Sequence, residues 1–422
     1  MQVSERVKGI AASQSLAMAA RAKAMKAAGV DVISMSLGEP DMDTPEHIRR
    51  AAQEAIDNGW THYGPVAGIA SLRAAVAAAQ NANCRLQIED CKFEAADVIV
   101  SVGAKMAIYN AIQTVVNPGD EVVIPMPSWV SYTEMVKVAG GKLVAVRTKY
   151  ENRYCLTADE LREALTEKTR MLILCSPNNP TGSIYSHSQL KALVEVLREY
   201  PEVVVLSDEI YDALVYDEYI NIDKHSNATQ SPQDSLQKCA IASENDKNNI
   251  CSMAEFGELA ERLIIVNGVS KAYAMTGWRI GWLMSKNKAF IEACARLQGQ
   301  QVTCATMVAQ KAAEAALTGS QDCVEQMRQV FAERRELICK LAAEIPGWKF
   351  EKPQGAFYLF PDVSALGGGD KVAEYLLDEA HVAVVSGLAF GCPECIRLSY
   401  AISTEEIVES MRRIKSAIEK LR

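Results

Sequence analysis

A lysine, an arginine and two glycines lie close together in SKAYAMTGWRIG, residues 270–281, shortly after the apolar run RLIIV. A short apolar run of this kind is typical of a buried strand. Lys271 therefore stands just past a strand end, and Arg279 follows between Gly277 and Gly281. A lysine amine becomes a nucleophile when its surroundings keep it neutral, and an arginine binds anions. The stretch thus predicts a reactive amine beside an anion site.

Further polar residues follow other apolar runs along the chain. Gly103 directly follows DVIVSV and begins a helical pattern. Asn179 follows RMLILCS, and Asp208 and Tyr211 follow VVVLS. Ligands of open α/β sheets bind beyond the carboxyl ends of the strands, so we expect these groups to meet there. Each residue also has a plain structural interpretation, such as a helix cap for Asp208. Together with Lys271 they match what pyridoxal phosphate requires: an amine, a carboxylate and a phosphate cradle.

The elements that must position these residues alternate between strand and helix. Apolar runs near residues 97–102, 120–125, 142–147, 170–176 and 203–207 each precede a polar turn or a helical pattern. This alternation predicts an α/β fold with a mainly parallel sheet and helices on both faces. From about residue 310 long helical patterns dominate, which indicates a separate α+β unit.

Residues 218–256 break this rhythm because they are polar and lack periodicity. A loop of that length inside a compact domain is usually functional or disordered. We interpret it as a solvated surface insertion.

The composition restricts the partners and the compartment. The chain has 422 residues and a formal net charge of −9, which argues against nucleic acid or a membrane surface as a partner. No run of 18 apolar residues suggests a membrane span. The first 30 residues are rich in Ala, Lys and Arg with one acid, like a transit peptide.

The 12 cysteines are scattered through the chain, unlike those of a secreted disulfide scaffold, so a reducing cytoplasm is expected. Cys392 and Cys395 form an isolated CxxC without a second ligand pair, and the five histidines show no ligand spacing. We therefore expect no metal.

Eight longer motifs now identify a family. In chain order they are GEPDMDTPEHI, GAKMAIYNA, GDEVVIPMPSWVSYTEMV, SPNNPTG, LSDEIYDALVY, NGVSKAYAMTGWRIGW, PQGAFYLFPDVS and IRLSYA. The chain resembles the class I pyridoxal-phosphate aminotransferases of fold type I, in particular the bacterial-type aspartate aminotransferases. The resemblance begins near Arg6, which rejects the transit peptide.

The resemblance implies a large domain with a mainly parallel seven-stranded sheet and a smaller α+β domain built from both termini. We accordingly expect an N-terminal arm and part of the small domain over 1–44. The large cofactor domain is expected over 45–310, and the small C-terminal domain over 311–422.

The resemblance also assigns roles to residues. Lys271, Asp208 and Tyr211 are the implied catalytic residues. Lys271 would bond the cofactor and move a proton, while Asp208 would face the pyridine nitrogen. Cofactor contacts fall on Gly103, Ala104, Lys105, Trp129, Asn179, Asp208, Tyr211, Ser270, Lys271 and Arg279. Tyr63 would reach the phosphate of a neighbouring subunit, which implies a homodimer.

Substrate contacts are implied for Arg397 on the α-carboxylate, and for Gly38, Trp129, Asn179 and Lys105. Lys105 would meet the side-chain carboxylate of aspartate or glutamate, although a first-turn lysine near solvent is the plain alternative. The implied reaction is ping-pong transamination from L-aspartate to 2-oxoglutarate, which gives oxaloacetate and L-glutamate.

Other readings stay open. The donor could instead be alanine, an aromatic amino acid or the amino product of prephenate. Prephenate users carry a basic residue before a Pro-Ser pair, whereas this chain reads Ala11-Ala12-Ser13. A carbon–sulfur lyase or a binding protein without catalysis would share much of the site. The family's Pro-Gly before Phe390 is Ser386-Gly387 here.

Overall fold

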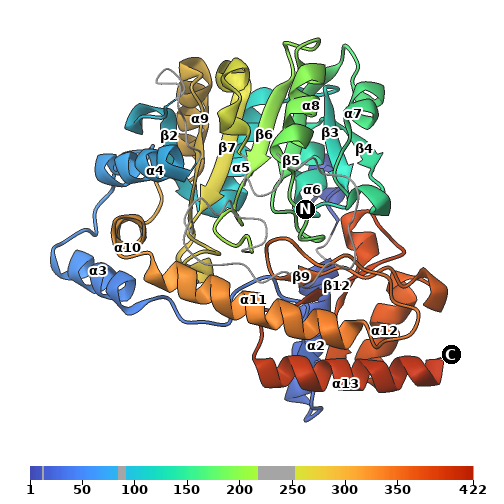
Figure 1. Cartoon of the computed structure of the whole chain (residues 1–422). Helices are drawn as coiled ribbons and strands as arrows, with labels where there is room; N and C mark the ends of the chain where they lie inside the picture. The colour runs from blue at the N-terminus through green and yellow to red at the C-terminus, as the bar shows by residue number, and fades with distance from the viewer. Residues whose placement is uncertain (12–13, 84–91, 217–251, 422) are drawn as a thin grey trace, which may run out of the picture.

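A seven-stranded sheet forms the centre of the larger part of the molecule in the computed structural model (Figure 1), which describes residues 1–11, 14–83, 92–216 and 252–421. Across the sheet the strands are β2 (Val98–Val102), β8 (Ile280–Met284), β7 (Leu263–Gly268), β6 (Val204–Asp208), β5 (Thr169–Cys175), β3 (Glu121–Met126) and β4 (Lys142–Arg147). Neighbouring strands are parallel except for β8, which runs antiparallel to both β2 and β7. The predicted mainly parallel sheet is confirmed.

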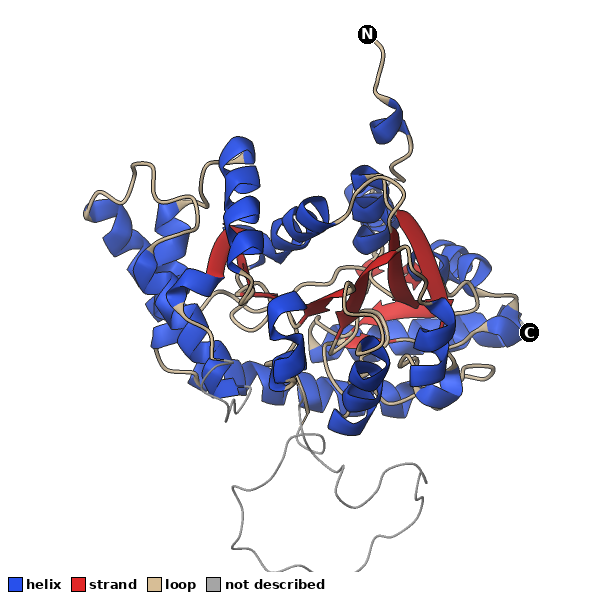
Figure 2. Ribbon diagram, turned by 90° about the horizontal axis from the view of Figure 1, so that it is seen from above, coloured by secondary structure: helices blue, strands red, loops and turns tan. Residues whose placement is uncertain are grey.

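Helices cover both faces of this sheet, as Figure 2 shows from above. Along β5, Met171 and Ile173 pack into one apolar cluster and Leu172 and Leu174 into the other, because successive side chains of a strand point to opposite faces. The first cluster includes α5 (Gly103–Val115), α6 (Ser131–Ala139) and α9 (Lys288–Gln301). The second includes α3 (Glu46–Asp57), α4 (Ala70–Asn83), α7 (Ala158–Ala164), α8 (His187–Leu197) and α10 (Met307–Thr318).

Both ends of the chain contribute to a smaller unit, seen in the lower part of Figure 1. There β1 (Ile33–Ser34) pairs in parallel with β10 (Val382–Ala383), and β12 (Ile396–Ser399) lies between β11 (Val385–Ser386) and β9 (Tyr358–Leu359). Its helices are α2 (Gln14–Ala27), α11 (Asp322–Ala342), α12 (Gly369–Glu379) and α13 (Thr404–Leu421), and the short α1 (Glu5–Lys8) precedes them. A third apolar cluster, which includes Phe331, Leu376 and Ile414, forms its core.

The packing of the cores refines the domain division that we propose. Helix α10 spans the predicted boundary at residue 310, and Ala312 and Ala316 pack in the large sheet cluster. The change of core falls inside α11, where Val324 contacts the sheet cluster and Met327 belongs to the third cluster. We therefore place the boundary in α11 rather than at 310, since a domain is delimited by its own core.

Some predicted features fall outside the described residues. These are residues 218–251 of the 218–256 insertion, together with Ala12 and Ser13 of the prephenate argument. The end of the insertion is ordered, because Ser252 caps a short 3₁₀ helix, Met253–Glu255. Within the described ranges, no helix has the length and apolar character needed to span a bilayer.

Candidate active site

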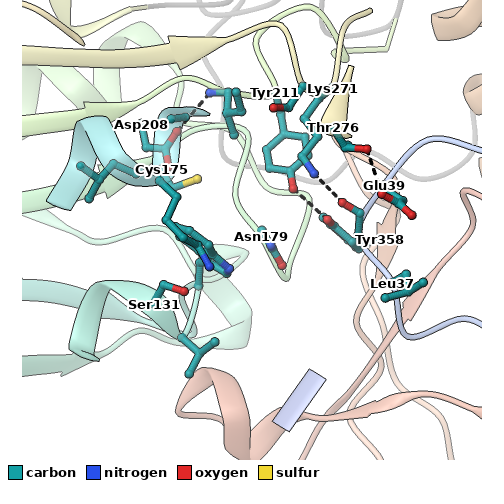
Figure 3. A pocket seen from close by; sticks show the side chains of 18 of the residues that line it. Leu37, Glu39, Ser131, Cys175, Asn179, Asp208, Tyr211, Lys271, Thr276 and Tyr358 are labelled. Carbon is teal, nitrogen blue, oxygen red and sulfur yellow. Dashed lines mark hydrogen bonds between the residues drawn. The ribbon is translucent and has the colours of Figure 1, made fainter. Parts of the chain in front are cut away.

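A cavity of about 490 Å³ opens beyond the carboxyl ends of β5, β6 and β7, where Figure 3 shows its lining. The segment 36–39, Tyr358 and Arg397 close its other side. The structure brings most of the predicted site residues to this one cavity: Gly38, Ala104, Lys105, Trp129, Asn179, Asp208, Tyr211, Ser270, Lys271, Arg279 and Arg397 all line it.

Two predicted residues do not line the cavity. Gly103 is buried but is not part of the lining, and Tyr63 has 91% of its surface exposed. Sequence reasoning in turn missed Tyr132, Cys175 and Tyr358, which do line it. No helical spacing marks Tyr132, because Trp129, three residues before it, lies ahead of the first residue of α6. Tyr358 lies in PQGAFYLFPDVS, a motif whose chemistry is not evident from residue types alone.

Lys271 follows β7 by three residues, and its Nζ donates a hydrogen bond to the carbonyl of Gly38. Loss of solvent around the amine lowers the pKa of Lys271 to about 8. The cations Arg397 and Arg279 act in the same direction, while Glu39 opposes them. A sizeable fraction of the amine is therefore neutral near pH 8, as a nucleophile or proton acceptor requires.

Asp208 is the last residue of β6 and is buried. Burial raises the pKa of Asp208 to about 6, because a low-dielectric site disfavours the charged carboxylate. The hydroxyl of Tyr132 donates to Oδ2 at 2.6 Å and the N–H of Ile210 donates to Oδ1 at 3.2 Å, and both act against this rise. The carboxylate is thus mainly ionised above pH 6 and ready to pair with a cationic ring nitrogen.

The N-terminus of α5 and Arg279 form an anion cradle. Gly103 opens α5 with a φ of +77° and no side chain caps the first turn, which leaves backbone N–H groups for a ligand. A Cβ at Gly103 would lie 2.4 Å from a guanidinium nitrogen of Arg279, so glycine permits this close approach. Ser270 and Lys105 line the same cavity. A phosphate group fits this donor set.

Lys105 sits in the first turn of α5, with its Nζ 4.8 Å from the centre of the Trp129 ring. Loss of solvent lowers the pKa of Lys105, and the nearby charge of Arg279 adds to this. A cation near a helix N-terminus is unfavourable unless an anion offsets it. The position therefore favours an anionic ligand group next to Lys105.

Arg397, on β12, is buried and held at two points. Its guanidinium donates to Oδ1 of Asn179 at 2.9 Å and to the carbonyl of Ser36 at 2.7 Å. The guanidinium carbon lies 4.5 Å from the centre of the Tyr358 ring and 4.9 Å from that of Phe390. Among the described residues its Nε has no hydrogen-bond partner. A planar, fixed guanidinium with a spare donor suits a carboxylate.

Tyr211 completes the group near the lysine. Its hydroxyl lies 2.7 Å from that of Tyr358. Figure 3 marks this hydrogen bond with a dashed line. Burial raises the pKa of Tyr211 well above its usual value, and the neighbouring Tyr358 adds to the effect. Tyr211 therefore stays protonated and can donate a hydrogen bond to an anionic oxygen.

These residues fit pyridoxal phosphate on three observations. The cradle of Gly103 and Arg279 suits its phosphate, the ionised Asp208 suits its ring nitrogen, and the partly neutral Lys271 suits its aldehyde. Among the described residues no three metal-ligating side chains gather, and the sulfur atoms of Cys392 and Cys395 lie 3.4 Å apart as free thiols. The expectation of no metal stays a prediction.

Comparison with known proteins agrees with this geometry. Residues 30–414 match the family model "Aminotransferase class I and II". The chain is 39% identical to an aspartate aminotransferase of Bacillus sp. (strain YM-2), with 98% of each chain covered. It is 37% identical to an aspartate/prephenate aminotransferase of Nitrosomonas europaea, with 99% of this chain and 100% of the relative covered.

Solved structures show the same similarity. The aspartate aminotransferase of Rhizobium meliloti superposes with a TM-score of 0.87 at 35% identity, over 99% of both chains. The aspartate aminotransferase of Thermus thermophilus with maleate superposes with a TM-score of 0.86 at 35% identity, over 99% of this chain and 100% of that one. The chain therefore shares both its fold and a third of its sequence with these two enzymes.

Proposed function

Since this chain belongs to the aminotransferase class I and II family and is a pyridoxal-phosphate-dependent aminotransferase of the aspartate aminotransferase type, we propose that its substrates are L-aspartate and 2-oxoglutarate. Their products would be oxaloacetate and L-glutamate, formed in two half-reactions at one site. The observation that carries this proposal is that Lys105 and Arg397 line one cavity. Two cations in one cavity suit a substrate with two carboxylates.

Bound pyridoxal phosphate supplies a carbon that takes up the amino group and a ring that withdraws electrons from the substrate Cα. Lys271 would hold the cofactor through its Nζ, and the same Nζ, when neutral, would accept the proton from the substrate Cα. The lowered pKa of Lys271 supports this role, because a protonated amine could not accept that proton.

The remaining cofactor contacts are those that the family resemblance implies. Asp208 would keep the ring nitrogen protonated, and Tyr211 and Asn179 would donate hydrogen bonds to the phenolic oxygen. Trp129 would stack on the ring. Ser270, Arg279 and the backbone of Gly103 and Ala104 would hold the phosphate, beside Lys105.

Arg397 binds the substrate α-carboxylate by two-point contact, and the backbone of Gly38 adds a hydrogen bond. Asn179 orients Arg397 through the 2.9 Å bond between Nη1 and Oδ1. This fixes the substrate Cα next to the Nζ of Lys271, which itself bonds the Gly38 carbonyl. Proximity of the two reacting groups contributes strongly to the rate.

Lys105→Met tests the substrate assignment, since methionine keeps the aliphatic stem on Trp129 but removes the charge. The rate of the half-reaction with aspartate should fall by about 10- to 100-fold, the loss expected when one charge-assisted hydrogen bond is removed. The rate with alanine should stay unchanged. Lys137→Met, on the exposed side of α6, serves as the matched control. Equal losses for aspartate and alanine would exclude Lys105 from substrate choice.

The same half-reactions with tyrosine and the amino product of prephenate decide among the other donors. The relative of Thermus thermophilus was solved with maleate, a dicarboxylic acid, which supports the dicarboxylate assignment. Pyruvate released from a cysteine conjugate without any 2-oxo acid would instead favour a carbon–sulfur lyase.

We propose a homodimer in which Tyr63 reaches the phosphate site of the neighbouring subunit. The exposure of Tyr63 supports this arrangement, as does its absence from the lining of the chain's own cavity. Light scattering gives the mass in solution, and Tyr63→Phe should weaken cofactor binding without changing that mass. A cytoplasmic location is part of the proposal, supported by the free thiols of the described cysteines.

A further inference from the structure

Two buried cysteines of one loop have their sulfur atoms in contact, and the proposed chemistry uses neither of them. The Sγ atoms of Cys392 and Cys395 lie 3.4 Å apart, and both residues carry free thiols. The N–H of Cys395 donates to the carbonyl of Cys392, and the N–H of Cys392 donates to the carbonyl of Gly387. The backbone of this loop therefore brings the two thiols together.

The same loop supports Arg397. Phe390, whose ring centre lies 4.9 Å from the guanidinium carbon of Arg397, comes two residues before Cys392. Arg397 itself comes two residues after Cys395, on β12. The N–H of Gly387 donates to the carbonyl of Cys395 at 2.7 Å, which joins the two arms of the loop. A change in the distance between the two sulfur atoms therefore acts on the segment that ends in Phe390 and Arg397.

The two thiols differ in their access to solvent. Cys392 is 3% exposed and lies between Gly391 and Pro393, which are both exposed, whereas Cys395 is 0% exposed. A small oxidant, of about the size of water, therefore reaches Cys392 before it reaches Cys395. The Cys395 thiol is then the nearest nucleophile to an oxidised Cys392.

The titratable and charged groups around the pair decide how fast it reacts. Within the described residues they are Glu394, which pairs with Arg147, and the hydroxyl of Tyr154, 3.6 Å from the Cys395 sulfur. The hydrogen bond with Cys395 and the loss of solvent raise the pKa of Cys392, and Glu394 adds to this. The reactive thiolate is therefore scarce near neutral pH, so oxidation needs a sustained excess of oxidant.

We propose that Cys392 and Cys395 are a modification site at which hydrogen peroxide forms an intramolecular disulfide, and that this disulfide weakens substrate binding at Arg397. Peroxide oxidises the Cys392 thiol to a sulfenic acid and leaves as one water. The Cys395 sulfur then attacks the Cys392 sulfur, and the hydroxyl group leaves with the thiol proton as a second water. Two thiols and one peroxide thus give one disulfide and two waters.

The disulfide would change the geometry around the proposed carboxylate site. Its formation brings the sulfur atoms from 3.4 Å to about 2.05 Å. Rotation of the two cysteine side chains takes up part of this change, and the loop between Phe390 and Arg397 takes up the rest. The modification itself does not depend on the proposed function, whereas its effect on the substrate rests on the role proposed above for Arg397.

Peptide mass analysis of the wild-type holoenzyme tests the modification without any variant. The tryptic peptide 372–397 contains these two cysteines and no other. After treatment with excess hydrogen peroxide it should be about 2 Da lighter and resist alkylation, and dithiothreitol should restore both thiols. A peptide that keeps two alkylatable thiols would overturn the proposal, whether or not transamination of aspartate is observed.

Single serine variants test the order of the two steps. Cys395→Ser should stop at the sulfenic acid of Cys392, which dimedone traps. Cys392→Ser should stay largely unmodified, because Cys395 has no exposed surface. Equal trapping in the two variants would contradict the proposed order.

Kinetics test the effect on the substrate. Oxidation should lower kcat/KM by about tenfold for aspartate and alanine alike, because a small displacement of Arg397 affects the carboxylate common to both. The double variant Cys392→Ser/Cys395→Ser should keep its activity under peroxide. Cys294→Ser, which removes a lone buried thiol of α9, should respond like the wild type. An unchanged kcat/KM in the disulfide form, or an equal loss in the double variant, would overturn the effect at Arg397.

Discussion

The two sides of the cavity are built in different ways. The sheet side, consisting of Asn179, Asp208, Ser270, Lys271 and Arg279, comes from the ends of neighbouring strands in one sheet. The opposite side, consisting of Ser36–Glu39, Tyr358 and Arg397, comes from two segments that lie more than 300 residues apart in the sequence. Backbone hydrogen bonds along a continuous sheet fix the sheet side. The opposite side is joined to it by side-chain contacts and by scattered backbone bonds, such as that from the N–H of Ala356 to the carbonyl of Leu214.

Three side-chain hydrogen bonds are examples of these contacts. Arg397 bonds Asn179, Lys271 bonds the Gly38 carbonyl, and Thr276 bonds Glu39. A rigid sheet side suits a permanently held cofactor, and a side joined by scattered contacts suits a substrate that must enter and leave. We therefore expect changes on the sheet side to affect the cofactor, and changes on the opposite side to affect the substrate.

The largest effect is expected for Lys271→Ala on the sheet side. Transamination should fall by at least about 10³-fold, because the variant loses both the covalent anchor and the proton acceptor. Steady-state rates with aspartate and 2-oxoglutarate measure this loss. Borohydride reduction followed by peptide mass analysis should place the cofactor on residue 271 of the wild type and nowhere on the variant. Fixation at another lysine would refute the assignment.

Arg397→Ala, on the opposite side, should cost about 2–5 kcal/mol in kcat/KM, since the substrate carboxylate loses its partner in a desolvated site. Cofactor affinity should stay near that of the wild type, which fluorescence titration checks. Arg397→Lys, which keeps the charge but not the planar fork, should recover part of the loss. A parallel loss of cofactor affinity would contradict the expectation that the opposite side affects only the substrate.

The charge of Arg397 should nevertheless affect the pKa of Lys271 across the cavity. Arg397 helps to lower the pKa of Lys271, so Arg397→Ala should raise it above about 8. The neutral fraction of the amine then falls at pH 8, and the rate of cofactor attachment to cofactor-free protein should reach its plateau at higher pH. Attachment rates measured from pH 6 to 10 give this value. An unshifted profile would indicate that the two sides are electrostatically independent.

The smallest effect is expected for Thr276→Val, which removes the exposed 2.9 Å bond to Glu39. An exposed hydrogen bond contributes little, so the KM for aspartate should rise by no more than about two- to threefold. Thr44→Val should do more, because Thr44 donates to the Ala274 carbonyl and accepts from Trp278 in a partly buried site. A larger rise in KM for Thr276→Val than for Thr44→Val would show that the bond to Glu39 closes the cavity.

The sequence predicted the two sides of the cavity for different reasons. On the sheet side, Asp208, Asn179 and Lys271 follow apolar runs, and parallel strands align their carboxyl ends, so residue order nearly sets their meeting point. No such local pattern leads to Arg397, and its role came from the resemblance of IRLSY to a family motif. Tyr132 and Tyr358 were missed because nothing local marks a buried tyrosine as a hydrogen-bond donor to a particular partner.

By itself, the sequence determined the alternation of strands and helices. It also pointed to the edge of the sheet at which we place the chemistry and to the lysine that we propose as reactive, because strand periodicity and polar strand ends are local properties of the chain. Only the tertiary structure decided that Ser36 lies against Arg397 and Tyr132 against Asp208. It also decided that the core changes within α11 rather than at residue 310. These features depend on how separate apolar faces pack, and packing is a property of the whole chain rather than of any segment.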